Sequence, residues 1–282
     1  INAACHGRLR NRRPHRRVID RPTPARHRHA RAGGFSGGPA ISAVSSREGP
    51  GVRERETVLT ATVDPEQLEG ELRAWIAQPA FPCVGAKSAL ARGTLKVVPA
   101  RDIASGWNDV HIHDALLHWA YGWRDEPEGL RSLAVVFEGP LDLSEAAFER
   151  HMWARIQSLA DKDHWRGQPY DERVSADPGD PHFSLSFGGE AFFVGPLQPT
   201  PSRSAPRFAA YRLVFNLHDQ FERLRAEGRY ERMREAILDR DKALAGTVNP
   251  MLARHGEASE AAQYSGRLVG PDWAAPFRDK RA

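Results

Sequence analysis

The sequence is poor in cysteine and in long apolar runs. Cys5 and Cys83 are its two cysteines in 282 residues, which is too few for a disulfide framework or for a closed four-cysteine zinc site. No stretch approaches the roughly 18 to 20 apolar residues that cross a bilayer, and no apolar segment follows the basic N-terminus as in a secretory signal. We therefore predict a cytoplasmic protein with no membrane partner.

Two widespread catalytic signatures are also missing. The chain has neither a Walker A phosphate loop nor a His-Glu-x-x-His helix, which removes the commonest sequence evidence for a nucleotide hydrolase or a zinc protease. The 40% of hydrophobic and 27% of charged residues are ordinary for a soluble globular protein, and the length suits one large domain or two small ones.

Positive charge is concentrated at the start of the chain. Residues 1–57 hold thirteen arginines and no lysine against four acidic residues, a net charge of +9, and the whole chain carries +4, which leaves residues 58–282 at −5. The folded part therefore has no net basic field for phosphates. We expect a small-molecule partner rather than a nucleic acid.

The Arg-rich segment 1–57 mixes Arg, His, Pro and Gly without a helical or strand period. Such a composition cannot bury enough apolar surface to offset its ordering entropy, so we expect disorder. No methionine precedes Met152, and we interpret residues 1–57 as upstream read-through, with translation starting near Val58. The alternative is a basic arm that binds RNA or an acidic partner.

From Asp64 onward the pattern is globular. Helical spacing predicts helices from Pro65 to about Ile76, around Leu116 and Trp119, and from Glu145 to about Asp161. A loop with a short helix is expected within FPCVGAKSALARG at 81–93, and further helices at 218–226 and 230–244. Strands are expected at 95–98, 133–137, 183–187, 191–194 and 212–215, with Gly188 and Gly189 closing a hairpin. The prediction is a single α+β domain, a small mixed or antiparallel sheet flanked by helices, followed by an irregular C-terminal cap.

Several blocks of this sequence are idiosyncratic. They are Phe81-Pro82-Cys83, FSLSFGG at 183–189, Ser202-Arg203, LVFNLHDQFERLRAEGRYERMREAILDRD from Leu213, and HGEASEAAQYSGR from His255. Together they resemble the YqcI/YcgG family from about Pro65 to Phe277. Characterised members bind heme and hydroxylate a nitrogen, on the guanitoxin and cycloserine routes. The resemblance implies that residues 58–282 form a domain that binds heme b and N-hydroxylates a guanidino group or an amine of an amino acid such as arginine, using molecular oxygen and an electron donor.

Two positions compete for the heme iron. His218, between Asn216 and Gln220 at an expected strand-to-helix junction, is our first candidate for axial ligand, and the alternative is a histidine that caps the following helix. The family more commonly carries Gly-Leu-His-Pro before Ser-Arg, where this chain has Gln198. If that histidine is the family's ligand, Gln198 replaces it with an amide, which is a poor heme ligand.

Other residues are candidates for the heme pocket and the substrate. Cys83 could offer a thiolate to iron, although a buried structural thiol is the simpler interpretation. Ser202 and Arg203 are expected to anchor a carboxylate, of a heme propionate or of the amino acid, and a surface ion pair is the alternative.

A guanidinium substrate calls for carboxylates and hydroxyls. Glu222 and Glu260 are the predicted catalytic carboxylates, Asn216 is expected to contact the substrate, and Tyr264 to line the cofactor pocket. Asp219 shares a helical face with Glu222, and its simpler interpretation is a solvated helix side.

Three other functions remain open. A non-catalytic heme- or ligand-binding relative is consistent with Gln198, with Ala262 in place of the family's arginine and with Ala275 in place of its cysteine. A non-heme metal site could use the pair His111 and His113 with Asp114 and His118, but an i, i+2 pair diverges on a helix. Nucleic-acid binding would depend on residues 1–57 alone.

Overall fold

The computed structural model describes residues 64–79, 81–198, 208, 210–246 and 256–281. The helices are α1 (Pro65–Ala77), α2 (Val84–Ala91), α3 (Asp109–Asp125), α4 (Glu145–Trp165), α5 (His218–Ala226), α6 (Tyr230–Ala245) and α7 (Ala261–Tyr264). The strands are β1 (Leu95–Asp102), β2 (Ser132–Gly139), β3 (Leu185–Phe187), β4 (Glu190–Leu197) and β5 (Tyr211–Leu217). These elements form one α+β domain, as the sequence predicted.

Local signals set the helix starts. The Asp64 side chain accepts a hydrogen bond from the Glu66 amide, and Pro65 occupies the first helical position of α1. Ser144 caps α4 in the same way, because its Oγ accepts from the amide of Ala147 at 3.3 Å. Helix α4 continues to Trp165, four residues beyond the predicted end at Asp161, because Asp163 is buried and bonded to other elements.

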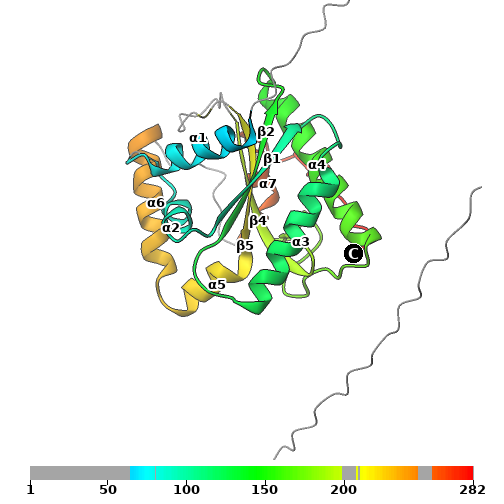
Figure 1. Cartoon of the computed structure of the whole chain (residues 1–282). Helices are drawn as coiled ribbons and strands as arrows, with labels where there is room; N and C mark the ends of the chain where they lie inside the picture. Colours follow the sequence, from blue (N-terminus) through cyan, green and yellow to red (C-terminus); the bar gives the residue numbers. More distant parts are fainter. Residues whose placement is uncertain (1–63, 80, 199–207, 209, 247–255, 282) are drawn as a thin grey trace, which may run out of the picture. The chain divides into compact units, whose positions relative to one another are not determined.

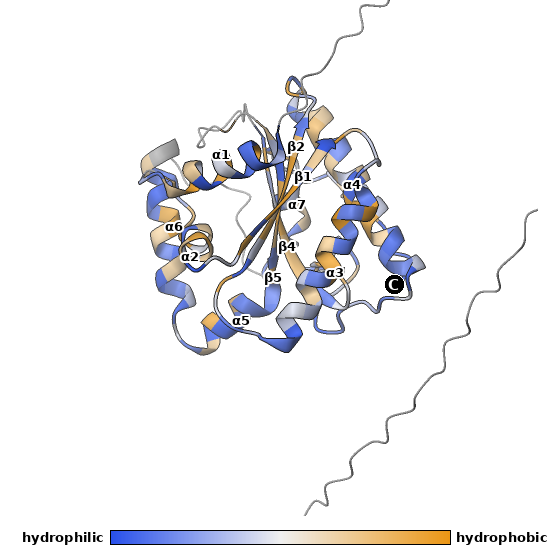
Figure 2. Ribbon diagram, viewed as in Figure 1, coloured by the Kyte–Doolittle hydropathy of each residue, from blue (hydrophilic) through white to orange (hydrophobic). Residues whose placement is uncertain are grey.

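The five strands form one mixed sheet in the order β1-β2-β5-β4-β3. Strands β1 and β2 are parallel, and the other neighbours are antiparallel. Helices α1, α2 and α6 lie on one side of the sheet, whereas α3 and α4 lie on the other (Figure 1). The strands and the inward faces of the helices are apolar, and the outward faces are mostly hydrophilic (Figure 2).

Each side of the sheet has its own core. Trp123, Trp153 and Phe215 belong to the larger core, under α3 and α4. Trp75 and Val136 belong to the smaller core, under α1 and α2. Because β2 and β5 contribute alternate residues to both cores, the sheet joins them into one packed unit.

The β3–β4 hairpin closes at Gly188 and Gly189, as predicted. Both have positive φ, 61° and 76°, which a two-residue hairpin turn requires. A Cβ at Gly188 would lie 3.0 Å from Leu117 Cδ2. The turn can therefore pack this closely against α3 because glycine has no side chain.

Some predicted boundaries were wrong. Phe183 and Ser184 precede β3 rather than belonging to it, and β4 runs to Leu197 instead of ending at Val194. The expected irregular C-terminal cap contains the short helix α7. The predicted disorder of residues 1–57 and the boundary at Val58 lie outside the described residues.

Among the described residues, none of the helices has the length and apolar character that a membrane span requires.

Candidate active site

A cavity of about 270 Å³ lies where α2, α5 and α6 meet the ends of β2 and β5. Its lining residues from the first half of the chain are Cys83, Gly85, Ala86, Leu130 and Ser132. Those from the second half are Phe193, Asn216, His218, Gln220, Phe221, Arg225, Tyr230, Met233, Arg234, Ile237, Leu238, Glu260 and Gln263. The wall therefore combines many apolar side chains with a few polar ones, which is typical of a small-molecule site.

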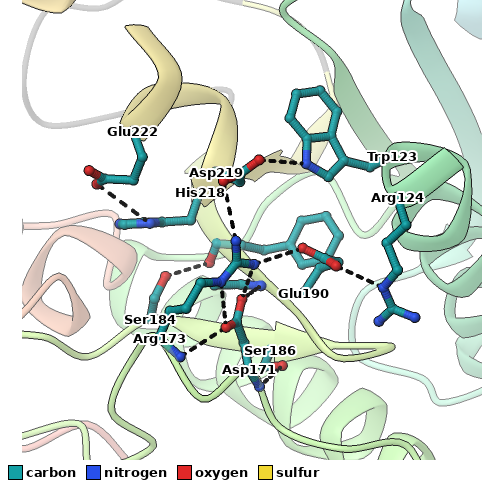
Figure 3. Close-up of polar contacts among 12 residues, drawn as sticks. Trp123, Arg124, Asp171, Arg173, Ser184, Ser186, Glu190, His218, Asp219 and Glu222 are labelled. Atoms are coloured by element: carbon teal, nitrogen blue, oxygen red, sulfur yellow. Dashed lines mark hydrogen bonds and ion pairs between the residues drawn. The ribbon is translucent and has the colours of Figure 1, made fainter. Parts of the chain in front are cut away.

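His218 sits at the junction of β5 and α5. Leu217 ends the strand with extended backbone angles, and His218 is the first residue of the helix. The residue is 8% exposed, and its Nδ1 lies 3.8 Å from the Glu222 Oε1 one helical turn later (Figure 3). Leu217 is the N-cap residue of α5 and makes no side-chain cap bond. His218 therefore lies inside the first turn of the helix instead of preceding it. The role of its ring, on iron or on the helix backbone, stays a prediction.

An ion-pair network fixes this junction from the α3 side. Asp219 accepts hydrogen bonds from Trp123 Nε1 at 3.1 Å, from Arg173 Nη1 at 3.2 Å and from Arg223 Nε at 2.9 Å. Arg173 also bonds Asp171 and Glu190, and Figure 3 shows it at the centre of these carboxylates. The acidic first turn of α5 is thus held to the sheet, and the position of His218 with it.

Glu260 reaches the cavity from the start of α7. It is 5% exposed, and its Oε2 accepts hydrogen bonds from the Tyr264 hydroxyl at 2.6 Å and from Ser184 Oγ at 3.3 Å. Burial and, next, the charge of Glu260 raise the pKa of Tyr264 well above its usual value. The hydroxyl therefore keeps its proton at neutral pH and acts as a donor to Glu260.

Two amides complete the polar wall. Asn216 Oδ1 accepts from Ser132 Oγ at 2.7 Å, and Gln220 Oε1 accepts from the Arg131 amide at 2.7 Å. Both side chains are therefore fixed in orientation by elements beside the cavity. The sequence predicted Asn216, and Gln220 was used there to place His218 but not assigned a role.

Cys83 lines the cavity as the N-cap of α2. Its Sγ accepts a hydrogen bond from the Ala86 amide at 3.4 Å. Burial raises the pKa of the thiol, although the backbone hydrogen bonds from Ala86 and Gly85 lower it in part. The raised pKa and the capping hydrogen bond favour a structural role for this thiol.

Gln198 lies away from the cavity. It is 6% exposed, and its Nε2 donates to Glu145 Oε1 at 2.8 Å and to the Gly266 carbonyl at 3.4 Å. The cavity-lining residue of the same chain segment, Phe193, is five residues earlier, about 17 Å along an extended chain. Gln198 and His218 therefore belong to different environments.

The remaining predicted residues fall into three groups. Tyr264 is buried behind Glu260 rather than on the cavity wall. Glu222 is half exposed, pairs with Arg225 and faces His218, so it does not line the cavity. Ser202 and Arg203 lie outside the described residues.

Sequence reasoning missed one face of β4 and the cationic part of α6. Phe193 alternates with the core residues Phe192 and Val194, so its orientation toward the cavity follows from the strand period. Met233, Arg234 and Ile237 line the cavity from α6, and the sequence analysis assigned none of them to the site.

The histidine pair on α3 does not form a metal site. His113 is fully buried, and its Nε2 bonds Asp163 Oδ1 at 2.7 Å, whereas His111 and His118 are exposed. The two members of the pair point to different sides of the helix, as the i, i+2 spacing requires. Within the described ranges, no group of three or more His, Cys, Asp or Glu residues is arranged to hold a metal ion.

Comparison with known families gives one result. The model of the YqcI/YcgG family matches residues 72–278, a range that contains every cavity-lining residue. Comparisons with curated proteins and with solved structures gave no match.

Proposed function

The chain belongs to the YqcI/YcgG family, and from that premise we propose that it is a heme-dependent oxygenase that N-hydroxylates a guanidino group or an amine of an amino acid such as arginine. One observation supports this most strongly. The cavity brings a buried imidazole, His218, and a buried carboxylate, Glu260, to the same largely apolar space.

The donor set fits heme b. His218 is the residue that we assign to the iron, and the carboxylate of Glu222 near its Nδ1 is the kind of outer partner that orients metal-bound imidazoles. Phe193, Ile237 and Leu238 supply the apolar surroundings that a porphyrin ring requires. When bound, the heme would activate molecular oxygen with electrons from a separate donor.

Glu260 is the residue that we assign to the substrate cation. Its charge attracts a guanidinium or ammonium group, and the donors Tyr264 and Ser184 hold the carboxylate in place. The same carboxylate is positioned to take a proton from the substrate nitrogen before that nitrogen is oxidised. Asn216 would orient the substrate, because Ser132 fixes its side chain at the cavity wall.

Helix α6 forms one wall of the cavity. Met233, Ile237 and Leu238 line it from this helix, and their apolar side chains exclude water from the reacting groups. Arg234 and Arg225 are the cations on the same wall. Their charges would favour an anionic group of the ligand at that side.

A non-catalytic heme- or ligand-binding relative is the second candidate. Gln198 favours it, because an amide that is bonded to Glu145 cannot replace a histidine on iron. This candidate shares the cavity and the fold with the first. It differs in predicting ligand binding without turnover.

The test uses the full chain, produced with a heme precursor. We expect a strong Soret band in the parent protein that His218→Ala removes and that the exposed-histidine control His118→Ala retains. Arginine should be converted in the presence of a reductant, and Glu260→Gln should raise the KM for arginine by about tenfold to a hundredfold through loss of the charge pair.

Other results would redirect the assignment. No Soret band in the parent but a band in Gln198→His would place the family's iron ligand at position 198 and contradict the role of His218. A Soret band without turnover of any amino acid or guanidine would favour the non-catalytic candidate.

A further inference from the structure

Arg212 on β5 is a buried cation next to two aromatic rings. The residue is 1% exposed, and its Cζ lies 4.3 Å from the ring centroid of Trp75 and 4.5 Å from that of Phe208. Burial lowers the pKa of Arg212 to about 9, so the guanidinium remains protonated at pH 7. A full positive charge is therefore enclosed in the smaller core.

This charge has no counter-ion among the described residues. Its Nε and Nη1 are buried and have no hydrogen-bond partner, and in the same part of the chain no carboxylate forms an ion pair with it. Stacking on the aromatic rings offsets part of the free energy lost when the guanidinium leaves water, but an unpaired buried charge is still expected to lower the stability of the fold.

The sheet face beside Arg212 is open compared with the opposite face. On β4 and β5, Phe192, Val194, Phe215 and Leu217 point toward α3 and α4 and are fully buried, whereas five residues on the Arg212 side are partly exposed: Phe193, Gly195, Leu197, Val214 and Asn216. A Cβ built at Gly195 would meet only Phe193 at 3.9 Å and the Val214 carbonyl at 4.0 Å. We call these five residues the open strip.

The open strip leads from the cavity to Arg212. Phe193 and Asn216 are paired in the sheet and line the cavity. Two residues further along each strand, Gly195 pairs with Val214, and after two more Leu197 pairs with Arg212. The distance from Asn216 to Arg212 along β5 is therefore about 13 Å, within reach of a ligand that extends beyond the cavity.

We propose that Arg212 binds a carboxylate of the ligand that occupies the cavity, with that ligand lying along the open strip. The carboxylate belongs either to an amino-acid substrate or to a heme propionate, and a guanidinium recognises both in the same way. This rests on the proposed function for the identity of the ligand. The unpaired charge is then a binding group whose partner arrives with the ligand.

The first test compares stability without ligand. Arg212→Met should leave the melting temperature unchanged or raise it, because it removes an unpaired buried charge. Arg281→Met is the control, since the Arg281 side chain is only 7% exposed but pairs with Asp163 and Asp279, and it should lower the melting temperature. A clear decrease for Arg212→Met would overturn the proposal, because the charge would then serve the fold itself.

The second test uses ligand pairs that differ in the carboxylate. Arginine is compared with its decarboxylated analogue agmatine, and hemin with its dimethyl ester, on the parent protein, Arg212→Met and the exposed control Arg150→Met. If Arg212→Met loses the parent protein's preference for arginine over agmatine, Arg212 binds the substrate carboxylate. If it loses the preference for hemin over the dimethyl ester, Arg212 binds a heme propionate. The expected loss of affinity is about tenfold to a hundredfold. Equal affinities in the parent protein and Arg212→Met would contradict the proposal.

A failure of the proposed function gives a different result. In that case neither hemin nor arginine binds the parent protein, and the probe becomes acetate or benzoate at constant ionic strength. Stabilisation of the parent protein and of Arg150→Met, but not of Arg212→Met, would support the carboxylate site on its own. Stabilisation of none, or of all three alike, would overturn it.

Discussion

Arg281 and Arg212 are two largely enclosed arginines that differ in whether a carboxylate pairs with them. Arg281 donates to Asp163, to Asp279 and to the Ser186 carbonyl, and it stacks over Tyr170. The Arg212 guanidinium stacks on Trp75 and Phe208, and its buried Nε and Nη1 have no hydrogen-bond partner among the described residues. Because a paired charge supports the fold and an unpaired one weakens it, the first is best explained as structural and the second as a binding group.

Arg281 allows a prediction about stability. Arg281→Met would leave Asp163 and Asp279 as buried carboxylates without their cation. We expect a loss of about 3 to 5 kcal/mol in the free energy of unfolding, the usual cost when one partner of a buried pair is removed. Urea denaturation measures it, with the exposed Arg150→Met as control. A loss below about 1 kcal/mol would show that Arg281 does not support the fold through these pairs.

The carboxylates near the cavity also differ in what they contact. Glu260 faces the cavity and accepts hydrogen bonds from the hydroxyls of Ser184 and Tyr264. Glu222, in contrast, is half exposed and pairs with Arg225. In the proposed function, Glu222 would position His218 instead of binding the substrate. The sequence placed both in one catalytic set, because it showed their chemistry but not their orientation.

The segment between α4 and β3 is held by several polar contacts of Asp171. Asp171 accepts hydrogen bonds from the Arg173 side chain and from the amides of Arg173 and Ala191, and its own amide donates to Ser186 Oγ. These bonds hold the segment to the β3–β4 hairpin. Through Arg173 they also connect to Asp219 and the start of α5.

These contacts predict a pH dependence. Burial raises the pKa of Asp171, but the hydrogen bonds and charge of Arg173 outweigh it, and the net pKa is lowered. A lowered carboxyl pKa stabilises the fold above the unfolded-state pKa of about 3.9, and this stabilisation is lost as the pH falls through the folded-state value. Asp171→Asn should therefore be less stable than the parent protein at pH 7, and the difference should shrink below about pH 4.

Thermal denaturation of both proteins between pH 7 and pH 2.5 checks this expectation. Glu190 and Asp219 face the same Arg173 and are unchanged in the comparison, so the difference between the two curves isolates Asp171. A difference that is constant with pH would contradict the assigned role of its charge.

At the scale of the whole molecule, one sheet joins two cores. Trp75 reports on the smaller core and Trp123 and Trp153 on the larger one. Strands β2 and β5 contribute to both. Neither core can be exposed without separating the strands that support the other.

We therefore predict a single cooperative unfolding transition. In Trp75→Phe the smaller core no longer contributes tryptophan fluorescence. In this variant and in the parent protein, the midpoints from fluorescence and from far-UV circular dichroism should agree within each protein. The calorimetric and van't Hoff enthalpies should also agree. Two separated transitions in the parent protein would show that the cores unfold independently.

The sequence by itself determined the features that are local. The period of Leu68, Leu72 and Ile76 and the cap at Asp64 are enough for α1, and two glycines are enough for the hairpin. The blocks after Leu213 identified the family, which the match over residues 72–278 confirms. Element ends were less accurate where a residue such as Asp163 is bonded to distant elements.

Only the tertiary structure decided which residues share a site. Asn216, His218 and Glu260 are separated by up to 44 residues and meet at one cavity, whereas Gln198 bonds Glu145 elsewhere. The charge of Arg212 is equally visible in the sequence, but its missing partner is not. Strand periodicity fixes which side of a strand a side chain occupies, and only the packing of distant elements fixes what it meets there.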